Sequence, residues 1–201
     1  APIPDAGEAG KVAAATNWDR FFSQLETLSS TAPTSVHPIL SPEVHGVIVV
    51  GAAQPGDPEG FVDGVAEISR RLGWPVLAEA LSPLRGQSAR VPHLVTTYDT
   101  ILRNGMAAER LKPESVLCIG GWPTSKVLRS WIEASDPVIW LVSERADNRD
   151  ALHGRTHTVA MTLAALAESL MAGYGENGYE RLWAQYEEKV RPLLDVRLET
   201  E

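Results

Sequence analysis

Short apolar runs without polar alternation recur along this chain, and they limit its fold more than any other feature. They lie at residues 46–51, 74–78, 116–119 and 138–142. Such runs, rich in β-branched residues, are typical of strands buried on both faces of a parallel sheet. Segments with helical spacing between them supply the crossovers that parallel strands need. The pattern predicts an α/β, Rossmann-like three-layer domain with a parallel sheet of five to six strands and helices on both faces.

The sequence divides into this domain and two flanking segments. Residues 1–45 are rich in Ala, Gly and Pro and begin without Met, so we expect an interdomain linker with a short helix, cut from a longer chain. Residues 46–172 form the predicted domain. Residues 173–201 are predicted to hold a C-terminal helix, from Tyr179 to Val190, that ends ahead of Pro192, followed by a linker.

Within the domain, local signals predict the remaining elements. Asp57-Pro58 should start a helix that ends at Gly73. Further helices are predicted at 94–103, 106–111 and 163–170, an edge strand at 155–159, and loops at 81–92 and 143–150. The loop at 81–92 leaves the carboxyl end of a strand, so it should share a rim of the sheet with the turn that follows residues 116–119.

That turn is the strongest candidate for a functional site. Gly120-Gly121 ends the strand, and Thr124, Ser125 and Lys126 stand where the next helix begins. In open parallel sheets, ligands bind at the carboxyl ends of the strands. Free backbone N–H groups, the helix dipole and the lysine would favour an anion there. Alternatively, Thr124 or Ser125 only caps the helix and Lys126 is solvated.

Composition and spacing exclude several other functions. The net charge of -8 argues against a nucleic-acid partner. No apolar run is long enough to span a membrane, and we do not expect residues 1–15 to be a signal peptide, because they lack a basic region followed by an apolar core. The single cysteine, Cys118, lies in a predicted buried strand and suits a reducing cytoplasm. The five histidines are dispersed, so we expect no metal site.

The turn at residues 51–56 favours a dinucleotide site only weakly. It lacks the G-x-G-x-x-G spacing, and Pro55 removes one amide donor. Glu79 comes later than the acid that would bind a ribose. A free-standing nucleotide- or regulator-binding module that uses this turn remains the alternative function.

Several stretches of the sequence resemble a known family. They are residues 73–82 (GWPVLAEALS), 117–120 (LCIG) and 123–128 (PTSKVL), together with Trp131. In this order they are similar to the central domain of 2-succinyl-5-enolpyruvyl-6-hydroxy-3-cyclohexene-1-carboxylate synthase. That family consists of thiamine-diphosphate-dependent transferases of menaquinone and phylloquinone biosynthesis. The resemblance covers roughly residues 46–159.

The resemblance implies a middle domain that is inactive by itself. Family members have three α/β domains, and thiamine diphosphate and Mg2+ are held by the first and third. This segment would then contain no catalytic, cofactor-binding or metal-binding residue, and residues 173–201 would lead towards the missing cofactor-binding domain. Its implied partners are the flanking domains, further copies of the parent chain in a homo-oligomer, and acidic small-molecule substrates.

The resemblance also gives the turn after residues 116–119 a role. It implies that Lys126 contacts the acidic substrates isochorismate and 2-oxoglutarate, with Ser125 and Thr124 as lesser candidates. Some relatives carry a second basic residue where this chain has Val127. Arg85 and Arg129 are the candidates to supply the missing positive charge.

Overall fold

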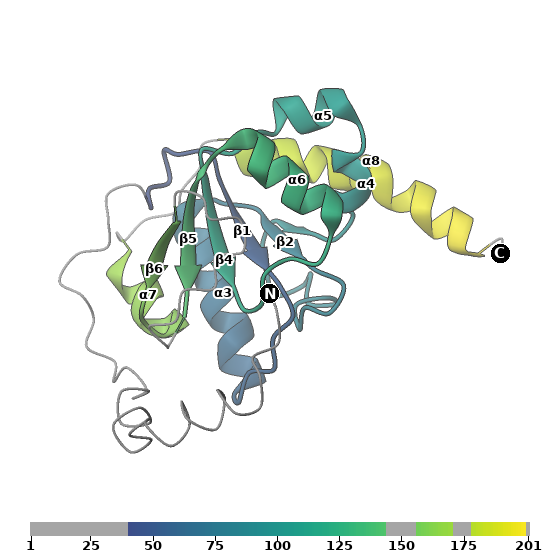
Figure 1. Ribbon diagram of the computed structural model, residues 1–201. Helices are drawn as coiled ribbons and strands as arrows, with labels where there is room; N and C mark the ends of the chain where they lie inside the picture. The colour runs from purple at the N-terminus through teal and green to yellow at the C-terminus, as the bar shows by residue number, and fades with distance from the viewer. Residues whose placement is uncertain (1–39, 144–155, 171–177, 200–201) are drawn as a thin grey trace, which may run out of the picture.

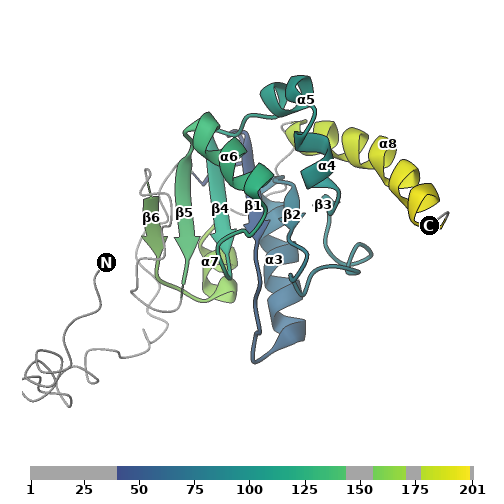
Figure 2. The same cartoon turned by 45° about the vertical axis from the view of Figure 1, so that its right-hand side comes forward.

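The computed structural model describes residues 40–143, 156–170 and 178–199. Its centre is a parallel sheet of six strands in the order β3-β2-β1-β4-β5-β6 (Figures 1 and 2). The strands are β1 Gly46–Val50, β2 Val76–Ala78, β3 Leu94–Val95, β4 Ser115–Ile119, β5 Val138–Val142 and β6 Thr156–Val159. All neighbouring strands run parallel. The predicted sheet is therefore confirmed, and its order is that of a Rossmann fold.

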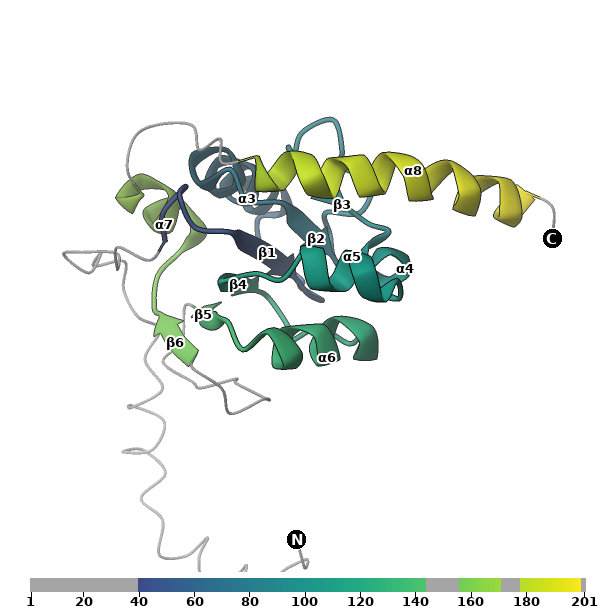
Figure 3. The same cartoon turned by 90° about the horizontal axis from the view of Figure 1, so that it is seen from above.

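Helices cover both faces of the sheet. α3 (Pro58–Leu72) and α7 (Leu163–Ser169) pack on one face, and α4 (Tyr98–Leu102), α5 (Gly105–Arg110) and α6 (Lys126–Ser135) on the other (Figure 3). α8 (Tyr179–Glu199) joins the second cluster through Tyr179 and Trp183. Alternate residues of β1 show the division, since Ile48 belongs to the first cluster and Val49 to the second. The three predicted layers are present.

The start and end of α3 follow from local chemistry. Asp57 precedes the helix, and its carboxylate accepts a hydrogen bond from the Gly60 N–H at 3.0 Å. Pro58 takes the first helical position, where its missing N–H costs nothing. Gly73 ends the helix with a φ of 63°, a left-handed conformation that favours glycine. The predicted bounds of this helix are confirmed.

Three predicted boundaries were wrong. The helix expected from residue 94 begins only at Tyr98, because Leu94 and Val95 pair with Val76 and Leu77 as the edge strand β3. β2 begins after Pro75, which has no N–H for the ladder, although its carbonyl accepts from the Ile48 N–H at 2.9 Å.

The third wrong boundary is the end of α8, which continues through Pro192 to Glu199. Residues 191–193 are exposed, so water can replace the hydrogen bond that the proline cannot donate. The predicted short helix after α4, the edge strand β6 and α7 are confirmed within a residue or two. Most of the predicted linker at 1–45 and of the loop at 143–150 lies outside the described residues.

Candidate functional site

The turns that follow β1 and β4 meet at the point where the strand order reverses. The Gly51 N–H donates to the Ile119 carbonyl at 3.0 Å, and the Gly121 N–H donates to the Ala52 carbonyl at 2.9 Å. A Cβ atom on Gly51 would lie 1.8 Å from the Gly121 oxygen. Only glycine fits at position 51, because the two backbones are in direct contact.

A cavity of about 680 Å3 opens beside this contact. Its wall includes the turn at residues 52–57, Phe61 of α3, the glycines after β4, Trp122 and Met161. The Trp122 indole N–H is buried and has no hydrogen-bond partner among the residues that the structure describes. No Lys or Arg is among the described residues that line the cavity, so this described part of the wall offers no cation to an anionic ligand.

Thr124, Ser125 and Lys126 lie on the same rim but outside this cavity. Ser125 is the N-cap of α6, and its hydroxyl accepts from the Leu128 N–H at 3.1 Å. Lys126 is the first residue of α6; it is exposed and borders a shallow groove between α5 and α6. The capping interpretation is therefore correct for Ser125, and Lys126 projects from the helix start.

A carboxylate of the chain itself occupies the N-terminus of α6. Glu79, which directly follows β2, is only 2% exposed. Its carboxylate accepts from the Thr124 N–H at 2.8 Å, the Thr124 hydroxyl at 2.5 Å and the Ser125 N–H at 3.3 Å. The Tyr98 hydroxyl donates a fourth bond at 2.7 Å. An internal carboxylate thus accepts from both N–H groups that directly precede α6.

These contacts set the protonation states of the cluster. Burial by itself raises the pKa of Glu79, but the hydrogen bonds from Thr124, Tyr98 and Ser125 outweigh it and lower that pKa below its usual range. Burial, together with the bond to Glu79, raises the pKa of Tyr98 far above its usual value. Glu79 is therefore an ionised acceptor and Tyr98 a protonated donor at neutral pH.

A second carboxylate connects α4 to the same turn. The Ser125 hydroxyl donates to Asp99 at 2.6 Å, and the Arg103 guanidinium donates to Asp99 at 2.9 Å. Ser125 thus accepts from its own helix and donates to a neighbouring one. Together, Glu79 and Asp99 hold the start of α6 against β2 and α4.

The two arginine candidates lie in different surroundings. Arg129 is half-buried one turn after Lys126, and neither side chain has a hydrogen-bond or ion-pair partner in the described part of the chain. Arg85 is exposed on the loop after β2 and donates to the Thr96 carbonyl at 3.0 Å. Arg129 and Lys126 are thus neighbours on α6, whereas Arg85 is held beside the start of α4.

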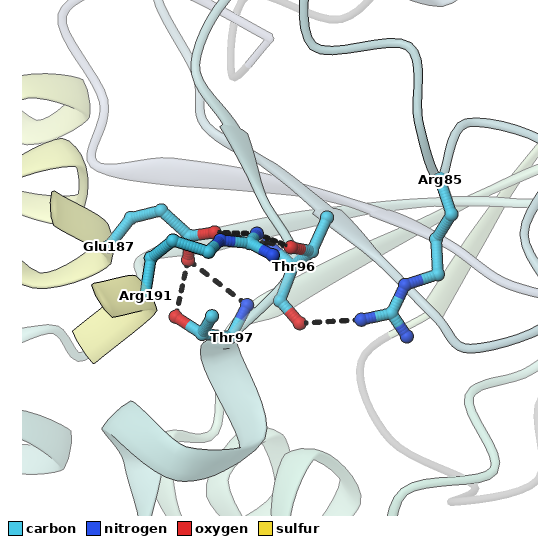
Figure 4. A network of polar contacts seen from close by, with 5 residues as sticks. All are labelled: Arg85, Thr96, Thr97, Glu187 and Arg191. Carbon is cyan, nitrogen blue, oxygen red and sulfur yellow. Dashed lines mark hydrogen bonds and ion pairs between the residues drawn. The ribbon is translucent and has the colours of Figure 1, made fainter. Parts of the chain in front are cut away.

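Arg85 borders a network that fastens α8 to α4 (Figure 4). The Glu187 carboxylate accepts from the N–H groups of Thr96 and Thr97 at 3.2 and 3.0 Å, and from both threonine hydroxyls. Arg191, one turn along α8, pairs with Glu187 at 2.5 Å. Burial raises the pKa of Glu187, but these bonds outweigh that effect and lower it. Glu187 therefore satisfies N–H groups at the start of α4.

Two further observations concern the described residues as a whole. No three His, Cys, Asp or Glu side chains in ranges 40–143, 156–170 and 178–199 lie together in a way that could hold a metal ion. In those ranges, no helix has both the length and the apolar character needed to cross a membrane. Cys118 is buried in β4, as expected.

Glu79 is the residue of this site that sequence reasoning missed. We considered it only as a ribose-binding acid, and it instead lies at the start of α6. An acid placed directly after a buried strand was the available signal. That signal gains meaning only with the strand order, which places β2 two positions from β4.

Known proteins match this chain along most of its length. The model of a family described as "Middle domain of thiamine pyrophosphate" matches residues 20–195. Three relatives carry the name 2-succinyl-5-enolpyruvyl-6-hydroxy-3-cyclohexene-1-carboxylate synthase. The protein of Nostoc sp. (strain PCC 7120) is 37% identical over 99% of this chain and 35% of its own length. That of Trichodesmium erythraeum is 43% identical over 76% and 27%. That of Synechococcus elongatus is 38% identical over 98% and 34%. The chain spans about a third of the length of these curated relatives.

Proposed function

This chain belongs to the family of thiamine pyrophosphate enzyme middle domains, and from that premise we propose that it is the central domain of a 2-succinyl-5-enolpyruvyl-6-hydroxy-3-cyclohexene-1-carboxylate synthase. The parent enzyme would be a transferase that joins decarboxylated 2-oxoglutarate to isochorismate. Relatives with that name, 35 to 43% identical to this chain, support the proposal. They are about three times as long as the segment that they share with it.

The described residues do not fit thiamine diphosphate, the cofactor that the family name implies. A diphosphate is usually bound with Mg2+ and carboxylate or carbonyl ligands, or at a free helix N-terminus. The large cavity presents no cation among its described lining residues, and the starts of α3 and α7 in its wall are capped by Asp57 and Thr162. Outside the cavity, Glu79 bonds to the two residues before α6. We therefore assign thiamine diphosphate and Mg2+ to flanking domains of the parent, and expect this segment to be inactive alone.

The domain's own contribution is proposed to be a positive charge for acidic substrates. The observation that carries this proposal is Lys126, an exposed cation without a partner among the described residues, at the carboxyl rim of the sheet. Arg129 lies one turn further on the same helix and adds to the positive potential. Thr124 and Ser125 use their donors inside the protein, so Lys126 is the group left to meet a substrate carboxylate.

Kinetics of the full-length synthase test this role. Lys126→Ala should raise the KM for isochorismate or 2-oxoglutarate about 10- to 100-fold, because a charge-assisted hydrogen bond contributes about 1.5 to 3 kcal/mol. Lys189→Ala is the matched control. It removes an exposed lysine of α8 that lines neither the large cavity nor the groove beside Lys126. Unchanged KM values for both substrates would remove Lys126 from the substrate site.

The alternative function, a free-standing nucleotide- or regulator-binding module, has one structural observation behind it. The turn at residues 52–57 forms part of the wall of the large cavity. The family match over residues 20–195 favours the synthase domain. Thermal shift with adenine nucleotides would test the alternative, because a ligand that binds the folded state raises the melting temperature.

A further inference from the structure

The segment between β4 and α6 has little regular structure to fix it. Residues 120–125 belong to no helix or strand, and Gly120 has a φ of 77°. Of its backbone N–H groups, that of Gly121 bonds to Ala52, whereas those of Thr124 and Ser125 bond to Glu79. The backbone N–H groups of the last two residues before Lys126 are therefore both held by one side chain, that of Glu79 directly after β2.

We propose that Glu79 is a positioning residue, whose buried carboxylate fixes the turn at residues 124–126 and so directs Lys126 towards the acidic substrate. This inference rests on the proposed function of Lys126. Glu79 itself is only 2% exposed, so its carboxylate is shielded from a substrate. It acts through the two N–H groups and the hydroxyl that it accepts from.

The position of Glu79 in the fold makes this role specific. Glu79 leaves the end of β2, and its own N–H donates to the Val50 carbonyl of β1 at 3.0 Å. Its backbone is thus part of the sheet, while its side chain reaches the start of α6. Tyr98 of α4 holds the carboxylate from a third element at 2.7 Å. Glu79 therefore fixes the turn to the sheet, and not to a neighbouring loop.

The same geometry gives the Glu79 carboxylate and a substrate carboxylate different donors. Both N–H groups before Lys126 face an internal carboxylate that cannot exchange with solvent ligands. A substrate carboxylate then meets only the lysine ammonium, which is a flexible point charge. The direction of Lys126 therefore depends on where its backbone is held.

Glu79→Gln in the full-length synthase tests the inference. Glutamine has nearly the same size and keeps one acceptor, but it turns an NH2 group towards N–H donors of the turn. We expect the KM for the substrate that Lys126 contacts to rise about 3- to 10-fold, with kcat changed by less than about twofold. A fall in kcat with unchanged KM would contradict the proposal.

Glu180→Gln is the matched control. Glu180 is also a carboxylate with 2% exposure, but it lies at the start of α8 and pairs with its neighbour Arg181. It should leave the KM unchanged even where it lowers the melting temperature. Equal KM effects of the two glutamine variants would show a general loss of stability and would overturn the positioning role.

A double mutant separates this inference from the proposed function. If Glu79 acts through Lys126, then Glu79→Gln should raise KM no further in a Lys126→Ala background. A full additional effect in that background would refute the positioning role while leaving Lys126 as a substrate contact. No effect of Lys126→Ala alone would instead overturn the proposed function.

Tyr98→Phe is the second variant, for the case that Glu79→Gln fails to fold. It removes one donor to the Glu79 carboxylate and should give a smaller KM increase in the same direction. An unchanged KM would count against the inference.

Discussion

Glu79 shows how a buried charge can be tolerated at a single residue. Burying a carboxylate is costly unless hydrogen bonds replace its water. Here two N–H groups and two hydroxyls do so, at the positive end of a helix. The donors come from α4 and from the turn before α6, so the ionised form holds three parts of the chain together.

This arrangement predicts a specific dependence of stability on pH. Because the pKa of Glu79 is lowered in the folded protein, its stabilisation is complete above about pH 4.3, the ordinary pKa of a glutamate, and is lost as the pH falls through the folded value. Glu79→Gln should melt below the wild type at neutral pH, and the difference should shrink in acid. Tyr98 stays protonated throughout, and Asp99 is present in both proteins. Melting temperatures from pH 7 down to acid would check this, and a constant difference would contradict it.

Sequence reasoning singled out this turn but did not predict the internal contacts of its residues. Thr124, Ser125 and Lys126 were found because a glycine break and a helix start follow a buried strand. Their internal partners, Glu79 and Asp99, come from residues 45 and 26 positions away. No local pattern identifies such partners, because the strand order decides which acid reaches which helix.

At the scale of elements, α8 is the piece whose attachment depends on few side chains. Its first half carries Tyr179 and Trp183 into the second core cluster, and its last turns extend beyond the sheet (Figures 1 and 2). Between them, Glu187 accepts from both threonines at the start of α4. The sequence predicted an amphipathic helix here but placed its end before Pro192, because proline usually ends a helix. In the structure the helix continues, and residues 191–193 are exposed to water.

Removing Glu187 should loosen α4 and α8 together. Glu187→Ala leaves the N–H groups of Thr96 and Thr97 without their acceptor, which costs about 1 to 3 kcal/mol. We expect faster amide hydrogen exchange in α4 and α8 and unchanged exchange in α3, which packs on the other face of the sheet. Glu188→Ala, on the exposed side of the same helix, is the control. Equal exchange profiles for the two variants would show that Glu187 does not fasten the helices.

For the whole molecule, most of the sheet could be predicted because its long buried strands have a recognisable local sequence pattern. The valine-rich runs of β1, β4 and β5 needed no tertiary information. β3 did, since Leu94 and Val95 form a strand only through pairing with β2. The cavity likewise arises from turns after four strands, at the point where the strand order reverses.

The charge of the chain and the lining of its cavity lead to a prediction about cofactor binding. The chain of 201 residues carries a net charge of -8, and its large cavity has no basic group among the described lining residues. The N–H groups of Thr124 and Ser125, directly before α6, already bond to Glu79. In the described wall of the cavity, a diphosphate would therefore find no cation, and side chains of the chain itself cap the two helices that start there, Asp57 for α3 and Thr162 for α7. Calorimetry with thiamine diphosphate and Mg2+ should detect no binding to this segment, whereas the full-length synthase, as the positive control, should bind both. Micromolar affinity of the segment would mean that the cofactor site does not belong to flanking domains alone.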